Sequence, residues 1–235
     1  MPAPTPLEDQ QARIATTARP TFWHRVRFDL VERALDGRTS VVDVGAGSGL
    51  LGAHLVARGI GYRFAESSPL LDAALAERYG EAARDGGGPI DAGTTATLLD
   101  VIEHVDDDVG LLRGVGDRME PGAGLVVTVP ALGWLHSSWD DDLGHRRRYS
   151  RSEARRAVEA AGFTVDEVSY LFPELVPLAL LRRLRPSGTG AAEFPDLPRW
   201  VDRLAGTVCA ASARLRRVWP VGTSVVVVAR RRGGV

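Results

Sequence analysis

The chain has 235 residues, which is enough for one α/β domain with an insertion or for two small domains. Its hydrophobic content of 44%, charged content of 25% and formal net charge of −1 are typical of a globular protein without a field that attracts nucleic acid. The single cysteine, Cys209, excludes an intramolecular disulfide and a cysteine-cluster zinc site. Because no apolar run resembles a signal peptide or reaches about 18 residues, we expect a cytoplasmic protein without stable membrane attachment.

Residues 11–35 are predicted to form an N-terminal helical cap, because apolar side chains recur at helical spacing from Phe22 onwards. Such a cap can serve simply to cover a sheet. It can also cover a cofactor, and a charge-assisted bond from Arg25 or Arg27 to a ligand carboxylate is then expected. The pattern alone leaves both alternatives open.

Residues 39–54 carry the strongest pattern in the chain, a strand followed by a glycine loop and a helix. The β-branched run at 41–44 is typical of a strand buried on both faces of a parallel sheet, and apolar residues resume at helical spacing from Leu50. Glycines stand between the two at alternate positions: Gly45, Gly47 and Gly49. They allow a sharp turn and a close approach to a ligand, so a nucleotide-like cofactor is predicted at the end of this strand.

The kind of cofactor depends on Asp43, which stands at the end of the strand before the first glycine. The glycines at 47, 49 and 52 also satisfy the dinucleotide pattern G-x-G-x-x-G, but a carboxylate there would repel a pyrophosphate. The same carboxylate favours the cationic sulfonium and ammonium groups of S-adenosylmethionine. The stretch V-V-D-V-G-A-G-S-G closely resembles the first motif of class I S-adenosylmethionine-dependent methyltransferases. An NAD-dependent oxidoreductase is the less favoured alternative.

A second strand is predicted at 62–66, and it ends at Glu66, 17 positions after Gly49. That spacing suits a carboxylate that accepts hydrogen bonds from both hydroxyls of a ribose. Glu66 and the adjacent Ser67 are therefore predicted to bind the cofactor. Pro69 then stands near the first turn of a helix that extends to about Tyr79.

Residues 80–95 are expected to contain a third strand that is short or missing, beside a flexible glycine loop. In the methyltransferases that the chain resembles, an acidic residue of this region usually lies near the adenine amino group. Asp85 and Asp91 are both candidates for that position. We take Asp85 as the cofactor-binding residue, with Asp91 as the alternative.

The run L-D-V-I-E-H-V-D-D-D within residues 97–108 is similar to the fourth-strand motif of a large group of small-molecule methyltransferases. An apolar strand is predicted to end at Asp100 and Val101, and a helix follows the acidic turn. The resemblance implies that Asp100 and Val101 meet the methionine part of the cofactor. It also implies that His104 lies beside the cofactor, as a wall of the active site more than as the base.

Residues 132–149 follow a predicted fifth strand at 125–130 and resemble a segment of a bacterial methyltransferase subgroup with the signature G-H-x-R-R-Y. The resemblance implies that this loop lies over the transferred methyl group and supplies side chains that face the substrate. Imidazole is the side chain best suited to take a proton near pH 7, and His145 is favoured over His104 and His136 as a base. The predicted catalytic residues are His145, His104, Asp141 and Tyr149.

The remaining chain is predicted to complete a single methyltransferase domain over residues 1–235. A capping box at Ser150 opens a helix, and alternation at 163–170 indicates a sixth strand. The core that binds the cofactor would span 36–170. An apolar, proline-containing excursion at 171–218 is predicted to be a helical lid, followed by the last strand within 219–230.

The three motifs together imply an α/β, Rossmann-like fold with a seven-stranded, mostly parallel sheet of order 3-2-1-4-5-7-6, one antiparallel strand and helices on both faces. The implied reaction is an in-line transfer of a methyl group from S-adenosylmethionine to a small-molecule acceptor, which leaves S-adenosylhomocysteine. The apolar lid predicts an aromatic or apolar acceptor, such as a secondary-metabolite intermediate. No metal is expected, because the carboxylates are scattered along the chain.

The predicted partner is the small-molecule substrate, without nucleic acid, and the chain is expected to be a monomer or a homodimer. The choice between an oxygen, nitrogen or carbon nucleophile stays open. A non-catalytic module that binds S-adenosylmethionine for regulation or assembly is the main alternative function.

Overall fold

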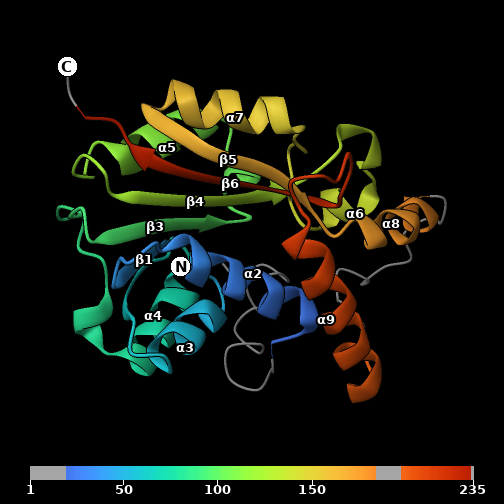
Figure 1. The fold of residues 1–235 in the computed structure, drawn as a ribbon. Coiled ribbons are helices and arrows are strands. Elements are labelled where there is room, and N and C mark those ends of the chain that lie inside the picture. The colour runs from blue at the N-terminus through green and yellow to red at the C-terminus, as the bar shows by residue number, and fades with distance from the viewer. Residues whose placement is uncertain (1–19, 184–196, 234–235) are drawn as a thin grey trace.

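A six-stranded sheet runs through the centre of the molecule in the computed structural model, which describes residues 20–183 and 197–233 (Figure 1). The sheet has the order β2-β1-β3-β4-β6-β5. Its strands are β1 (Ser40–Val44), β2 (Gly61–Ala65), β3 (Thr94–Leu99), β4 (Gly124–Pro130), β5 (Phe163–Leu171) and β6 (Ser224–Arg231). β1 pairs in parallel with β2 and β3, and β3 with β4, whereas β6 is antiparallel to both β4 and β5.

The sheet has six strands instead of the predicted seven, and its order therefore differs from the predicted one. The segment expected to form the third strand makes only a short contact with β2. Arg84 forms an isolated parallel bridge with Phe64, and the amide of Asp85 donates to the carbonyl oxygen of Phe64 at 2.7 Å. Gly86, Gly87 and Gly88 follow at once, and glycines have no side chain to pack on a sheet face. β2 is thus the edge strand on this side.

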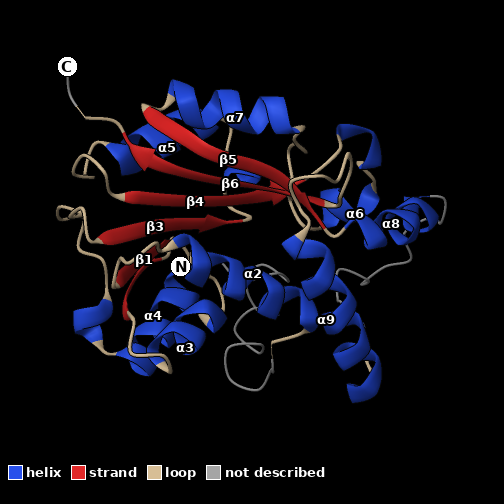
Figure 2. Ribbon diagram, in the orientation of Figure 1, coloured by secondary structure: helices blue, strands red, loops and turns tan. Residues whose placement is uncertain are grey.

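Helices cover both faces of the sheet, so the predicted α/β, Rossmann-like arrangement with helices on both faces is confirmed (Figure 2). α5 and α7 pack on one face, and α2 and α3 on the other, each through an apolar cluster. The helices are α2 (Phe22–Ala34), α3 (Leu50–Val56), α4 (Pro69–Tyr79), α5 (Asp108–Gly116), α6 (Ser138–Asp142), α7 (Arg151–Ala160), α8 (Val176–Arg183) and α9 (Arg199–Arg214).

The carboxyl ends of the parallel strands meet at one edge of the sheet, where α6, α8 and α9 also lie (Figure 1). The backbone is strained there. Asp100 after β3, Leu132 after β4 and Phe172 after β5 have φ values of 57°, 64° and 57°, which side chains other than glycine rarely adopt. Such residues cost on the order of 1–3 kcal/mol each and gather at ligand sites. The functional site is therefore expected at this carboxyl edge of the sheet.

The predicted lid at 171–218 begins at the last residue of β5 and contains α8 and α9, and its residues 184–196 lie outside the described part. Leu171 and Phe172 are buried, but the leucines of α8 are not. Leu178, Leu180 and Leu181 of α8 keep 40–48% of their surface exposed. Among the described helices, none is long and apolar enough to cross a membrane.

Candidate functional site

The glycine loop after β1 has the backbone that the sequence predicts. Gly45, Gly47 and Gly49 have φ values of 73°, 55° and 70°, in the left-handed region. The loop also packs closely on the fold, because a Cβ on Gly45 would lie 2.7 Å from Cγ2 of Val101 and one on Gly49 would overlap Leu75. Val101 therefore lies directly against the loop, as expected for two parts of one site.

Glu66 lies over the glycine loop from the end of β2. Its Oε2 accepts a hydrogen bond from the amide of Gly47 at 2.8 Å, and its Oε1 accepts one from the amide of Ser68 at 2.9 Å. The hydroxyl of Ser67 is 3.4 Å from the same Oε1. Each carboxylate oxygen has two lone pairs, so the group can also accept hydrogen bonds from vicinal hydroxyls of a ligand. These residues fit the ribose of S-adenosylmethionine.

Asp43 is buried beneath the loop, and its carboxyl group already has partners in the fold. Oδ1 accepts a hydrogen bond from the hydroxyl of Thr97 at 2.7 Å, and Oδ2 accepts one from the hydroxyl of Tyr62 at 3.1 Å. Burial raises the pKa of Asp43 to about 6, although these two hydrogen bonds act against the shift. The side chain thus joins β1 to the neighbouring strands β2 and β3.

The buried Arg27 forms an ion pair with the partly exposed Asp100, which precedes Val101. The Arg27 Nη1 atom is 2.8 Å from Oδ2 of Asp100, and its Nη2 donates to the hydroxyl of Thr128 on β4. The Nε atom of Arg27 is buried without a hydrogen-bond partner among the described residues. Arg25, the other candidate on α2, instead pairs with Asp202 of α9 at 2.8 Å. Of the two candidate arginines, Arg27 is therefore the one that lies with the predicted cofactor residues.

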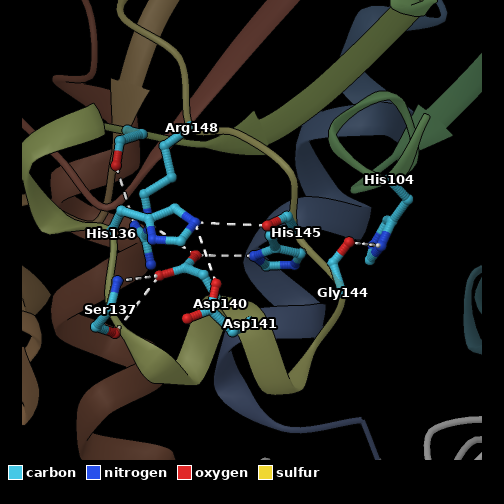
Figure 3. Close-up of polar contacts among 9 residues, drawn as sticks. His104, His136, Ser137, Asp140, Asp141, Gly144, His145 and Arg148 are labelled. Atoms are coloured by element: carbon cyan, nitrogen blue, oxygen red, sulfur yellow. Dashed lines mark hydrogen bonds and ion pairs between the residues drawn. The ribbon is translucent and has the colours of Figure 1, made fainter. Parts of the chain in front are cut away.

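His145 is held in place by a buried aspartate that the sequence analysis did not identify. Oδ1 of Asp140 is 2.9 Å from Nδ1 of His145 and 2.7 Å from Nε of Arg148 (Figure 3). The other oxygen accepts from the amide of Ser137 at 3.0 Å. Burial opposes the ionisation of Asp140, but the hydrogen bonds from His145 and Arg148 outweigh it and lower the pKa of Asp140 to about 2. An ionised carboxylate only accepts, so Nδ1 of His145 carries a proton and Nε2 holds the lone pair of the neutral ring.

His104 is oriented in the same way by a backbone carbonyl. Its Nδ1 is 3.2 Å from the carbonyl oxygen of Gly144, which can only accept, so the lone pair of the neutral ring is again at Nε2 (Figure 3). The rings of His104 and His145 meet edge to face, with centroids 5.0 Å apart. Burial, and next the neighbouring His145, lower the pKa of His104 and favour its neutral form. The two predicted histidines thus form a pair.

Asp141 and Tyr149 are not brought into the histidine pair, and the adenine contact of Asp85 or Asp91 stays a prediction. Asp141, next to the buried aspartate, keeps 70% of its side chain exposed. Tyr149 is buried, and its hydroxyl donates to Asp108 at 2.7 Å. The Asp85 carboxylate is paired with two arginine side chains, and Asp91 lies before the amino end of β3, away from the carboxyl edge.

The residues that sequence reasoning missed are Asp140, Arg148 and Glu103. A signal for Asp140 existed, because Ser137 and Asp140 form the capping box of α6. The same S-x-x-D spacing recurs one residue later and ends at Asp141, and only the fold decides which carboxylate turns inward. Glu103 is fully buried, and neither of its carboxylate oxygens has a hydrogen-bond partner among the described residues. Burial, and next the charge of Asp100, raise the pKa of Glu103 well above its usual range.

A family profile described as a methyltransferase domain matches residues 17–168. The chain belongs to this methyltransferase family. The predicted enzyme class, an S-adenosylmethionine-dependent methyltransferase, is thereby confirmed. Among curated proteins, no sequence matches the methyltransferase significantly.

Solved structures share the fold of the methyltransferase. A putative methyltransferase of Haloferax volcanii, in a complex with the Trm112 methyltransferase activator, has a TM-score of 0.60 at 18% identity, with 97% of both chains covered. The [4+2]-cyclase SpnF has a TM-score of 0.57 at 17% identity, with 97% of this chain and 93% of that chain covered. Phosphoethanolamine N-methyltransferase 2 of Haemonchus contortus, bound to phosphomonomethylethanolamine and S-adenosylhomocysteine, has a TM-score of 0.56 at 15% identity, with 99% and 62% covered.

Proposed function

We propose that the protein transfers the methyl group of S-adenosylmethionine to a small-molecule acceptor with an aromatic or apolar body. The observation that carries this proposal is the meeting of two groups of residues at the carboxyl edge. Val101 packs against the glycine loop at Gly45, and three residues later the chain reaches His104, which faces His145. A loop suited to a cofactor therefore adjoins a histidine pair suited to an acceptor.

On the cofactor side, each polar group has a role that follows from its charge. Glu66 would accept hydrogen bonds from the ribose hydroxyls, since its carboxylate lies beside the amide of Gly47. Arg27 would bind the methionine carboxylate, because it is the buried cation beside the loop and its Nε lacks a partner among the described residues. When bound, S-adenosylmethionine supplies an electrophilic methyl group on its sulfonium.

On the acceptor side, the arrangement of Asp140 and His145 suits proton transfer. The negative charge of Asp140 fixes the proton on Nδ1 and stabilises the imidazolium that forms when Nε2 takes a proton from the acceptor. This step is needed when the nucleophile of the acceptor carries a proton. Alignment and exclusion of water supply the rest of the rate enhancement.

The apolar body of the acceptor is inferred from side chains that the fold leaves exposed near this edge. α8 packs against residues Gly133–Leu135, and there Trp134 is 49% exposed. The leucines of α8 described above add to this apolar surface. An aromatic or aliphatic acceptor would cover part of it and gain about 25 cal/mol for each Å² of apolar surface removed from water.

The proposal is tested first by binding and then by turnover. S-Adenosylhomocysteine should raise the melting temperature of the protein, and NAD should not. Radiolabelled S-adenosylmethionine and a panel of aromatic hydroxyl and amine acceptors should then give labelled product. Stabilisation by NAD alone would contradict the proposal. Binding of S-adenosylhomocysteine with no turnover of any acceptor would favour a non-catalytic binding module.

A further inference from the structure

Three side chains at the acceptor side of the site lie close enough to share one ion. Glu103, His104 and His145 each offer one ligand atom, and these atoms lie within 4.8 Å of one another. When each ligand atom lies about 2.1 Å from a metal ion, the ligand atoms lie about 3–4 Å from one another. Small rotations of the three side chains would therefore bring their ligand atoms to the distances that a bound metal requires. Two of these residues are adjacent in sequence and the third comes from a distant loop, so their spacing in the sequence does not resemble a metal motif.

The hydrogen bonds of the two histidines are those of metal ligands. Nδ1 of His145 is bound to the carboxylate of Asp140, and Nδ1 of His104 is bound to the carbonyl of Gly144 (Figure 3). Histidines that bind metals usually donate their second ring N–H to a carboxylate or a backbone carbonyl, which fixes the tautomer and the ring orientation. Both rings are thereby prepared with a lone pair at Nε2.

Glu103 supplies the independent observation that points to a ligand. Its side chain is 0% exposed, yet both carboxylate oxygens lack a hydrogen-bond partner among the described residues. A buried carboxylate without a partner costs several kcal/mol, and fully buried acidic groups are generally paired or bound to a metal. The two buried aspartates of the site, Asp43 and Asp140, both have hydrogen-bonded partners.

We propose that Glu103, His104 and His145 bind a divalent transition-metal ion. Two imidazoles and one carboxylate suit Zn²⁺, Fe²⁺ or Co²⁺ and leave coordination positions open, whereas Mg²⁺ prefers an all-oxygen set. The site goes beyond the proposed methyl transfer and does not depend on the identity of the acceptor. The ion takes the lone pair that a general base needs, so His145 serves one of the two roles and not both.

A second group of possible ligands provides a matched control. Asp29, Glu32 and His54 also lie within reach of one ion. This group is partly exposed, however, and Glu32 already pairs with Arg58 at 2.8 Å and with His54 at 3.1 Å. None of its carboxylates is both buried and without a partner in the described structure. Ions should therefore prefer the Glu103 site.

The experiment titrates chelator-treated full-length protein with Co²⁺, followed by visible absorption, and then adds Zn²⁺ or Mg²⁺ as a competitor. We expect about one Co²⁺ per chain, displaced by Zn²⁺ and not by an equal concentration of Mg²⁺. Glu103→Gln and His145→Ala should weaken Co²⁺ binding at least tenfold, and Asp140→Asn should weaken it about 10–100-fold. His54→Gln should bind as the wild type does. Glu103→Gln is expected to fold, because the amide has nearly the size and shape of the buried carboxyl group.

Each contrary result is informative. Absence of stoichiometric Co²⁺ binding, equal binding by Glu103→Gln and wild type, or loss of binding in His54→Gln overturns the metal site. Displacement by Mg²⁺ does the same, because it indicates an oxygen site elsewhere. If no metal binds while methyl transfer is retained in chelator-treated protein, the proposed function stands with His145 as base. If the ion binds and no acceptor is methylated, the proposed function fails and the metal site remains.

Discussion

Asp43 and Asp140 are both buried carboxyl groups near the carboxyl edge of the sheet, but their surroundings shift their pKa values in opposite directions. Asp43, below the glycine loop, has only hydroxyl partners, and burial raises its pKa to about 6. Asp140, in the loop that follows β4, pairs with His145 and Arg148, which outweigh burial and lower its pKa to about 2.

This difference in pKa distinguishes the two halves of the site, the cofactor half around the glycine loop and the acceptor half around His145. In the cofactor half, Asp43 has a raised pKa and joins β1 to β2 and β3 through the hydroxyls of Tyr62 and Thr97. In the acceptor half, Asp140 is a fixed negative charge that sets the tautomer of His145, and Glu103 is a buried carboxyl without a partner among the described residues. Substitutions in the first half should therefore change cofactor affinity, whereas those in the second half should change turnover.

The largest effect is expected for His145→Ala. Whether His145 acts as base or as metal ligand, its loss should lower kcat by about 10²–10⁴. The dissociation constant for S-adenosylhomocysteine should stay within about twofold of wild type, because the residue belongs to the acceptor half. His136→Ala is the control from the same loop, since its Nε2 lies 3.5 Å from the carbonyl oxygen of His145 and 3.8 Å from the exposed carboxylate of Asp141. A kcat within about threefold of wild type in His145→Ala would contradict the division into halves.

The second prediction concerns the pH dependence of stability at Asp43. Between its unfolded pKa of 3.8 and its folded pKa of about 6, the native state binds more protons than the unfolded state, so stability falls as the pH rises. The difference corresponds to about 3 kcal/mol. Asp43→Asn lacks this term, and its stability relative to wild type should therefore rise by up to about 3 kcal/mol between pH 4 and pH 7, as measured by urea unfolding.

For Asp140→Asn we expect a pH dependence of stability opposite to that of Asp43→Asn. Its lowered pKa means that the ionised form stabilises the native state above about pH 4, and that this stabilisation is lost as the pH falls toward 2. The variant should therefore lose most stability relative to wild type near neutral pH. Parallel pH profiles for the two variants would show that the electrostatic contrast between the two aspartates is wrong.

Glu66→Ala should have a smaller effect, limited to the cofactor half. Removing the carboxylate leaves the ribose hydroxyls unpaired and should weaken binding of S-adenosylhomocysteine by about 1–3 kcal/mol in calorimetry. Ser67→Ala, whose hydroxyl is 3.4 Å from the same carboxylate, should change affinity less than twofold. Unchanged affinity in a folded Glu66→Ala protein would remove Glu66 from the site.

The features that the sequence predicted well are those fixed by neighbouring residues. The strand, glycine loop and helix at 40–56 follow from apolar runs separated by glycines, and these remain recognisable without any tertiary contact. The helix that begins after Ser150 is likewise set by a local capping box with Glu153. The prediction of α4 from Pro69 to Tyr79 succeeded for the same reason.

The features that it missed depend on contacts between distant segments. The third strand is missing from the described sheet because the chain turns into glycines after a single bridge at Arg84. Asp140 and Asp141 have the same local spacing to a serine, and only packing in the loop buries the first. The motif that contains Glu103 predicts a role for His104 and none for Glu103. The burial of Glu103 without a partner among the described residues can be recognised only in the folded structure.

The smallest effect is expected at the border of the acceptor half, on α8. Leu178 and Leu181 are 48% and 47% exposed, so Leu178→Ser and Leu181→Ser should change the free energy of unfolding by about 0.5 kcal/mol or less. If the apolar body of the acceptor covers them, each change should raise KM about 3–10-fold with kcat preserved, the value of one or two methylene contacts. Leu204→Ser on α9, at a position 60% exposed, is the control and should leave KM unchanged.

An unchanged KM in both α8 variants, together with a dimer in sedimentation that dissociates on these substitutions, would assign the exposed leucines to a partner chain. Because a lid contact changes KM at any protein concentration and a dimer contact acts only above its dissociation constant, assays at two protein concentrations separate the two cases.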